Sequence, residues 1–292
     1  LKKISFKGEF LGQDVSGYYI PKKSINLLYF EIKNLGIKSK VFFDNTKKFP
    51  NPSGKIEFNV LDENLLINFD YGKNLKIQES VYKNKNIHTN FNGELNFDPY
   101  FYFKILADIK KLNFEKLKLK KLYHFIIDEI SNKKINGELN INYSNKKITE
   151  KMEKKNKINM IFNNGDIISE NSSFHFANLN IQINFFLKKY PSFRDFNYEL
   201  LVKTEDINKF FKKIGIKKDK NLKKFNISID GRINLDAQKY YFDKILINKK
   251  NINKNKLTEL KYYFDKNFGD FISKDLDEKN FFLSLKDLLK PI

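Results

Sequence analysis

The sequence feature that most constrains the fold is an alternation of apolar and polar residues with a period of two. Residues 225–235 show it most clearly, with Ile, Gly and Leu on one side and Asn, Ser, Asp and Arg on the other. Similar alternation occurs in residues 4–12, 91–97 and 135–141. Successive side chains of a strand point to opposite faces, so these runs predict strands with one apolar face. Such strands favour antiparallel sheet, because buried parallel strands are apolar on both faces.

A glycine followed by a charged residue and an apolar residue recurs along the chain and accounts for half of the 12 glycines. The copies begin at Gly8, Gly54, Gly93, Gly137, Gly165 and Gly231. In the clearest copies the glycine lies on the apolar side of its strand, where it admits a bulge or a close approach of backbone. The repeat therefore predicts a sheet bent towards its apolar face. For any single copy, an ordinary hairpin exit is the alternative interpretation.

The apolar face of these strands is the candidate binding surface. Its predicted lining residues lie two positions before, or two or four after, the glycines: Phe6, Phe10, Ile56, Phe58, Phe91, Leu95, Phe97, Ile135, Leu139, Ile141, Ile229, Ile233 and Leu235. A bent groove would cover them with acyl chains, at about 0.8 kcal/mol per buried methylene. A compact sandwich would cover them with a second sheet. The sequence leaves both arrangements open.

Helical periodicity is confined to a few segments. Thr204 is placed to cap a short helix that closes at Gly215, and residues 115–131 carry apolar residues at helical spacing. Two further apolar stripes occur after residue 256. We therefore predict a mainly β fold with a few short helices. An antiparallel β-repeat region is expected over residues 1–250, followed by an amphipathic helical segment over residues 251–292.

The charge balance is strongly basic, with 55 Lys and Arg against 35 Asp and Glu and a formal net charge of +20. Only Arg194 and Arg232 are arginines, the residue best suited to bidentate phosphate and guanine contacts. The lysines are spread along the whole chain. We therefore expect them on the solvated faces of strands, with a general attraction to anionic headgroups and no nucleic-acid partner.

No arrangement of reactive residues in the sequence predicts catalysis. There is no Cys, and His88, His124 and His175 are too far apart in sequence to form a local metal pair. The common nucleophile, phosphate-binding and zinc motifs are absent from the sequence. We expect a protein that is not an enzyme and that uses no metal or cofactor.

The second half of the chain combines a strand, a short helix after an acidic residue, and a glycine-containing strand. The segments that carry this order are residues 164–167, 174–186, 198–204, 205–215, 225–235 and 241–247. Residues 92–97 leading into residues 106–112 belong to the same pattern. Over about residues 90–250 the chain resembles the AsmA family of bacterial envelope proteins.

The resemblance implies a long groove of antiparallel strands with an apolar lining. It also implies a periplasmic location, an inner-membrane anchor outside this chain, phospholipid as the ligand, and an outer-membrane partner protein. The expected role is then the passage of phospholipid between the inner and outer membranes during outer-membrane biogenesis, and this chain is expected to be a fragment. The main alternative is a structural or adhesive cell-surface β-repeat protein with a closed core. A nucleic-acid-binding protein ranks third and an enzyme last.

Overall fold

The fold is mainly β, as the sequence predicts, with two α-helices and one 3-10 helix among the described residues. The computed structural model describes residues 2–10, 13–44, 46, 52–112, 135–144, 155–176, 178–213, 217, 224–237 and 239–273. The chain divides into two compact units. Unit 1 comprises Leu1–Leu117 and Gly137–Lys151, and unit 2 comprises Lys118–Asn136 and Met152–Ile292.

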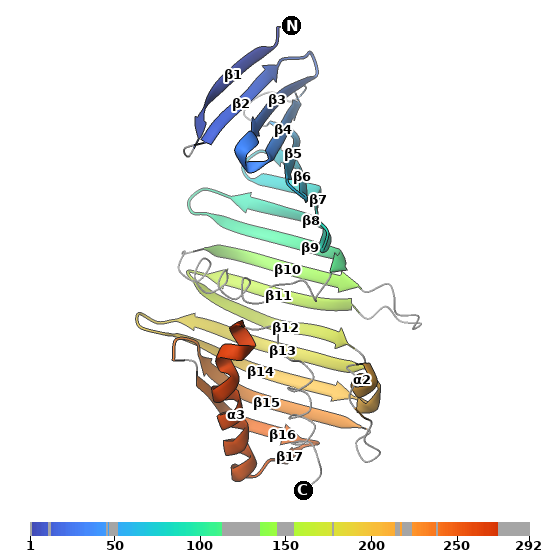
Figure 1. Cartoon of the computed structure of the whole chain (residues 1–292), viewed down its shortest axis with the longest axis vertical. Helices are drawn as coiled ribbons and strands as arrows, with labels where there is room; N and C mark the ends of the chain where they lie inside the picture. Colours follow the sequence, from blue (N-terminus) through green and yellow to red (C-terminus); the bar gives the residue numbers. More distant parts are fainter. Residues whose placement is uncertain are drawn as a thin grey trace. The chain divides into compact units, whose positions relative to one another are not determined.

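Unit 1 is an open antiparallel meander. Its described elements are β1 (Ile4–Phe10), β2 (Gln13–Ile20), β3 (Ile25–Ile32), η1 (Lys33–Leu35), β4 (Ile37–Asp44), β5 (Ser53–Val60), β6 (Glu63–Tyr71), β7 (Leu75–Lys83), β8 (Ile87–Asn96), β9 (Tyr102–Leu112) and β10 (Asn136–Ser144). Each strand from β1 to β8 pairs antiparallel with the next one along the chain. β9 also pairs with β10. Figure 1 shows β1 and β10 at opposite ends of this unit.

Unit 2 is built in the same way and adds the two α-helices. Its described elements are β11 (Lys155–Asn163), β12 (Asp166–Phe176), β13 (Leu179–Lys189), β14 (Arg194–Thr204), α2 (Ile207–Lys213), β15 (Phe225–Asn234), β16 (Lys239–Ile247), β17 (Lys250–Asn251) and α3 (Lys254–Ser273). Consecutive strands again pair antiparallel. In Figure 1, α2 lies beyond one end of the strands, and α3 is the long helix that packs on β16.

The helix α2 closes one end of the apolar face of unit 2. Ile207, Phe210 and Phe211 project from it into a buried core, where Phe211 is only 2% exposed. Leu179, Phe225 and Ile227 of the neighbouring strands complete this core. Positions 207, 210 and 211 fall on one helical face, so the short helix presents a single apolar stripe to the sheet.

The N-terminus of α2 differs from the sequence prediction. The Asp206 carboxylate, rather than the Thr204 hydroxyl, accepts a hydrogen bond from the backbone N–H of Asn208, at 3.0 Å. Thr204 Oγ1 instead accepts from the N–H of Asp206, at 3.1 Å, and orders the turn before the helix. Asp206 therefore caps the helix, and Thr204 stabilises the turn that leads into it.

The helix α3 lies within the predicted C-terminal helical segment and packs against β16. Leu260 is buried at this contact, and the N–H of Tyr240 donates to Asp265 Oδ1 at 2.8 Å. The second predicted apolar stripe and the predicted helix over residues 115–131 lie outside the described residues. The boundary predicted between residues 250 and 251 stays a prediction.

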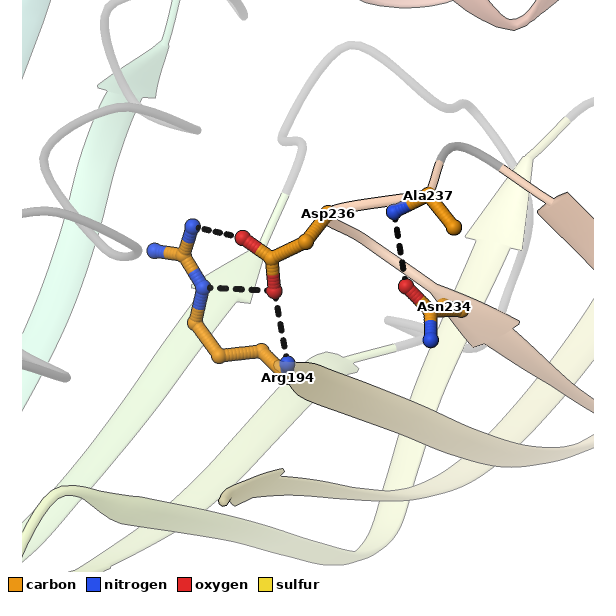
Figure 2. A network of polar contacts seen from close by, with 4 residues as sticks. All are labelled: Arg194, Asn234, Asp236 and Ala237. Carbon is orange, nitrogen blue, oxygen red and sulfur yellow. Dashed lines mark hydrogen bonds and ion pairs between the residues drawn. The ribbon is translucent and has the colours of Figure 1, made fainter. Parts of the chain in front are cut away.

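An ion pair fastens the turn after β15 to the start of β14 (Figure 2). Asp236 Oδ2 accepts from the backbone N–H of Arg194 at 2.6 Å and from its Nε at 3.3 Å, while Oδ1 accepts from Nη2 at 2.5 Å. Asn234 Oδ1 accepts from the N–H of Ala237 within the same turn, at 2.7 Å. Hydrogen bonds from Arg194 lower the pKa of Asp236 below its ordinary value. One of the two arginines therefore has a structural role.

Candidate functional site: the apolar face of unit 1

The strand register of unit 1 places its predicted lining residues on one side of the sheet. We call this surface the apolar face of unit 1. Its members include Phe6, Leu28, Phe30, Val41, Phe43, Ile56, Phe58, Leu65, Ile67, Phe69, Phe91, Leu95, Phe103, Ile105, Leu139 and Ile141. Seven of these residues, together with Phe10 and Phe97, are the candidates that the sequence predicted in this unit, and the candidate Ile135 lies just before its second segment.

One cross-strand row shows how the face is assembled. In strand order from β4 to β9, the directly opposed residues are Phe43, Gly54, Phe69, Ile77, Gly93 and Ile105. Directly opposed residues of antiparallel strands lie on the same face. Six consecutive strands thus contribute to one uninterrupted apolar row, with glycine at two of the six positions.

No second layer covers this face within the part of unit 1 that the structure describes. Its strands pack mainly against their own hydrogen-bonded neighbours and η1. Among the described residues, only Ile32 and Ile77 of unit 1 belong to the buried hydrophobic set; its other members lie in unit 2. Ile56, Phe58 and Leu95 are half-buried.

The remaining candidates lie in different surroundings. Phe97 follows the end of β8 and is 54% exposed, whereas Ile135 directly precedes β10 and is half-buried. The side chain of Phe10 lies outside the described residues. In unit 2, Ile229 packs against the core under α2 and Leu235 is buried, while Ile233 is half-buried opposite Phe196. Among the described residues, the apolar surface without a covering layer therefore belongs to unit 1.

Four of the predicted strand-bend glycines lie where a neighbouring strand approaches closely. A Cβ built on Gly231 would lie 2.5 Å from the carbonyl oxygen of Tyr241, and one on Gly93 would lie 2.8 Å from that of Lys104. Gly54 and Gly137 meet backbone carbonyl oxygens in the same way. Real Cβ atoms do not approach this closely, so these positions require glycine.

The other two copies of the glycine motif differ. Gly8 has nothing within 4 Å of an added Cβ. Gly165 lies in the turn between β11 and β12 with a φ of 98°, so the hairpin interpretation describes that copy. Gly17 does not belong to the motif, but a Cβ built on it would overlap the carbonyl oxygen of Tyr29.

A β-bulge centred on Ser80 bends unit 1, and the sequence analysis missed it. Ser80 is fully buried, and its Oγ accepts from the N–H of Asn68 at 3.0 Å. The preceding residue, Glu79, has a φ of 45°, and its N–H donates to Asn92 Oδ1 at 2.6 Å. Asn68 Nδ2 donates to the Glu79 carbonyl at 3.0 Å. Side chains from three strands thus form hydrogen bonds with the backbone N–H and C=O groups that the extra residue leaves unpaired.

The same arrangement recurs in unit 2 around Ser172. This fully buried serine accepts from the N–H of Asn159 at 3.0 Å, and Asn159 Nδ2 donates to the Glu170 carbonyl at 3.2 Å. Asn171 has a φ of 54°, and its N–H donates to Asn184 Oδ1 at 2.8 Å. Both units therefore bend through a serine flanked in space by two asparagines. We call these sites the Asn–Ser–Asn bulges.

The opposite side of unit 1 is polar and hydrogen-bonded to itself. The Tyr102 hydroxyl donates to Glu138 Oε1 at 2.8 Å, and Lys104 Nζ lies 3.0 Å from Glu138 Oε2. Burial and the Glu138 hydrogen bond raise the pKa of Tyr102 to about 12. At the other end, Tyr29 donates to Glu31 at 2.7 Å, and this bond raises the pKa of Tyr29 to about 12. These tyrosines therefore stay neutral donors at physiological pH.

The described residues offer no set of groups for metal binding. No group of three or more His, Asp or Glu among them could hold a metal ion. A shallow hollow of about 520 Å³ in unit 2 is lined by Glu170, Glu199, Asp230 and Asp243, with Tyr198 beside them. Burial raises the pKa of Tyr198, so this phenol is neutral. Nothing in the hollow supplies a nucleophile with an adjacent base.

Among the described residues, no helix is both long and apolar enough to cross a membrane. Comparison of the chain with protein-family models, curated proteins and solved structures finds no match. The similarity to the AsmA family therefore stays a prediction from sequence pattern. The site is described by its geometry alone, as an open apolar sheet face bent by bulges and close-packed glycines.

Proposed function

We propose that the apolar face of unit 1 holds phospholipid acyl chains. In this proposal the chain is a periplasmic segment of an AsmA-like protein, tethered to the inner membrane through a segment outside this chain. It shields lipid tails between the inner and outer membranes and so supports outer-membrane biogenesis. Its work needs no catalytic residue.

The observation that carries the proposal is the apolar row from Phe43 to Ile105, over which the described residues place no second layer. Adjacent strands lie about 4.8 Å apart, so a row over six strands extends roughly 24 Å. One leaflet of a bilayer contributes about 15 Å of hydrocarbon, half of a core of about 30 Å. The row is therefore long enough for a single acyl chain, and each methylene it shields contributes about 0.8 kcal/mol.

Two further properties favour lipid over a protein partner fixed by polar contacts. The apolar face offers acyl chains dispersion contacts without directed hydrogen bonds, so lipids of different length fit it equally. The net charge of +20 attracts anionic headgroups to the solvated rim of the sheet. A lipid bound in this way keeps its headgroup in water.

A photo-crosslinking experiment tests the proposal. A photoreactive amino acid replaces Leu95 on the apolar face, and a matched variant carries it at Asn90, which lies on the opposite side of the same strand. The chain is produced in a Gram-negative host, irradiated and analysed by mass spectrometry for attached and co-purified phospholipid. We expect lipid adducts at position 95 and a much lower yield at position 90.

The opposite result has a clear meaning. If neither variant yields lipid adducts and no phospholipid co-purifies, acyl-chain binding is excluded. A structural role with a closed surface, the alternative function, then becomes the better account. Equal adducts at both positions would indicate non-specific adsorption and would also count against the proposal.

A further inference from the structure

The turn between β8 and β9 is an exposed aromatic hairpin tip. It runs from Phe97 to Phe101, and all of its residues are exposed. Phe97 is 54% exposed, Tyr100 is 62% exposed and Phe101 is 44% exposed. Isolated exposed apolar side chains are common, but three large rings in one turn form a contiguous patch of the kind that binds a partner. We call residues 97–101 the aromatic tip.

The aromatic tip continues into the apolar face of unit 1. The ring centroids of Phe97 and Phe101 lie 5.9 Å apart, and those of Phe101 and Phe103 lie 6.3 Å apart. Phe103 is directly opposed to Leu95, and both belong to the apolar face. A partner that covers the tip therefore also meets the β8–β9 end of this face.

Basic turns lie at the same edge of unit 1 as the aromatic tip. Because consecutive strands are antiparallel, the β2–β3, β6–β7 and β8–β9 turns share one edge of the sheet, which we call the tip edge. These turns carry the exposed lysines Lys22, Lys23 and Lys73 against one acidic residue, Asp98. Lysines beside exposed aromatic rings match the anionic headgroups and the interfacial layer of a phospholipid bilayer.

The opposite edge of unit 1 has different exposed residues. Leu35 and Leu61 are 47% and 86% exposed there, and the described β3–β4, β5–β6 and β7–β8 turns contain no aromatic residue. Tyrosine combines an apolar ring with a polar hydroxyl and so suits the headgroup level of a bilayer. The two edges therefore differ in chemistry, and the opposite edge supplies matched controls.

The small size of the aromatic tip favours a bilayer over a folded protein as its partner. A stable protein interface takes about 20–30 residues from each side. A bilayer needs no complementary fold, and apolar insertion combined with electrostatic attraction is enough to hold a protein on it. We propose that the aromatic tip inserts into the headgroup region of an anionic phospholipid bilayer, with the lysines of the tip edge over the headgroups. This docking goes beyond acyl-chain binding and does not depend on it.

Tryptophan fluorescence tests which edge meets the bilayer. The chain has no Trp, so Tyr100→Trp places a single probe at the tip edge and Leu61→Trp places one at the opposite edge. Each full chain is mixed with vesicles of phosphatidylethanolamine and phosphatidylglycerol. We expect a blue shift of the emission for Tyr100→Trp and none for Leu61→Trp. Equal shifts, no shift for Tyr100→Trp, or the same shift without vesicles at higher protein concentration would overturn the proposal.

Vesicle flotation measures the contribution of the aromatic tip. The triple variant Phe97→Ser, Tyr100→Ser and Phe101→Ser should bind these vesicles roughly tenfold or more weakly, because it loses three inserted rings. Since all three residues are exposed, circular dichroism should show an intact sheet. The double variant Leu35→Ser and Leu61→Ser is the matched control and should bind as the parent does. Undiminished binding by the triple variant would overturn the proposal.

A pair of charge variants separates docking from adsorption by net charge. Lys23→Gln with Lys73→Gln should weaken vesicle binding several-fold. Lys33→Gln with Lys85→Gln removes the same charge from exposed residues of the opposite edge and should have a smaller effect. Equal effects of the two pairs would overturn the proposal. Neither fluorescence nor flotation requires an acyl chain on the apolar face, so a failure of docking and a failure of acyl-chain binding are distinguishable.

Discussion

At the residue scale, the two buried serines determine how the sheet bends. Ser80 and Ser172 lie in apolar rows and are fully buried. The hydroxyl of each accepts a hydrogen bond from a backbone N–H that has lost its carbonyl acceptor on the neighbouring strand. A buried N–H without an acceptor costs about 1–3 kcal/mol, which is more than a typical hydrogen bond contributes. Serine is therefore found at this position because its hydroxyl completes the hydrogen bonding of the bulge, although the surrounding side chains are apolar.

Replacing either serine should destabilise its own unit. We expect Ser80→Ala and Ser172→Ala each to lower the free energy of unfolding by about 1–3 kcal/mol, because the N–H of Asn68 or Asn159 loses its acceptor. Denaturant titration followed by circular dichroism measures the change. Ser24→Ala, at an exposed position, is the control and should change little. Equal effects at Ser80 and Ser24 would contradict this role.

Asp236 should give the chain a defined acid sensitivity. Its pKa is lower in the folded state, so its contribution is present above the ordinary value of 3.8 and disappears as the pH falls through the folded value. Asp236→Asn should therefore be less stable than the parent at pH 7, and the difference should shrink as the pH falls below 3.8. Asp62→Asn, which removes an exposed partner of Lys85, is the control with little expected effect. A constant difference across this pH range would contradict the assignment.

At the element scale, the close-packed glycines keep neighbouring strands in contact. Gly54→Ala should cost about 1–3 kcal/mol, because its Cβ would overlap the carbonyl oxygen of Phe42 and force the strands apart. Gly8→Ala is the matched control from the same motif. It has nothing within 4 Å and should be neutral or stabilising by up to about 1 kcal/mol. Thermal melting compares the two, and a reversed order would refute the argument.

The helix α2 should hold unit 2 together through its aromatic stripe. Phe211 is 2% exposed, and Phe211→Ala should lower the free energy of unfolding by about 3–5 kcal/mol. Exposed Lys212→Ala on the same helix is the control and should change little. Hydrogen exchange measured by mass spectrometry locates the effect. Protection should fall in β13–β15 and should persist in β3–β6 of unit 1.

The same elements show what the sequence could predict. Period-two alternation identified the strands around Phe6, Leu95, Leu139 and Ile229, because the alternation follows directly from strand geometry. The bulge at Ser80 escaped notice, since its only local sign is that the apolar face resumes three residues after Ile77. Whether a face stays open depends on packing between segments distant in sequence, so periodicity alone could not separate an open sheet from a closed core.

At the scale of the whole molecule, the two units differ in how far the described residues cover the apolar face of their sheet. Unit 2 covers part of its apolar face with α2, and it contains most of the buried hydrophobic residues that the structure describes. Unit 1 has a row of apolar side chains that are mostly half-buried, and no described layer covers it. This division explains why we assign acyl-chain binding to unit 1 and a closed core to the region under α2.

Fluorescence quenching by lipid tests this assignment most directly. The chain has no Trp, so Phe58→Trp places a single probe on the apolar face and Tyr18→Trp places one on the polar side. Phospholipids with brominated acyl chains quench only a nearby indole. We predict strong, saturable quenching of the Phe58→Trp variant and little quenching of the Tyr18→Trp variant. Equal quenching of both probes, or none at position 58, would contradict the claim that this face holds acyl chains.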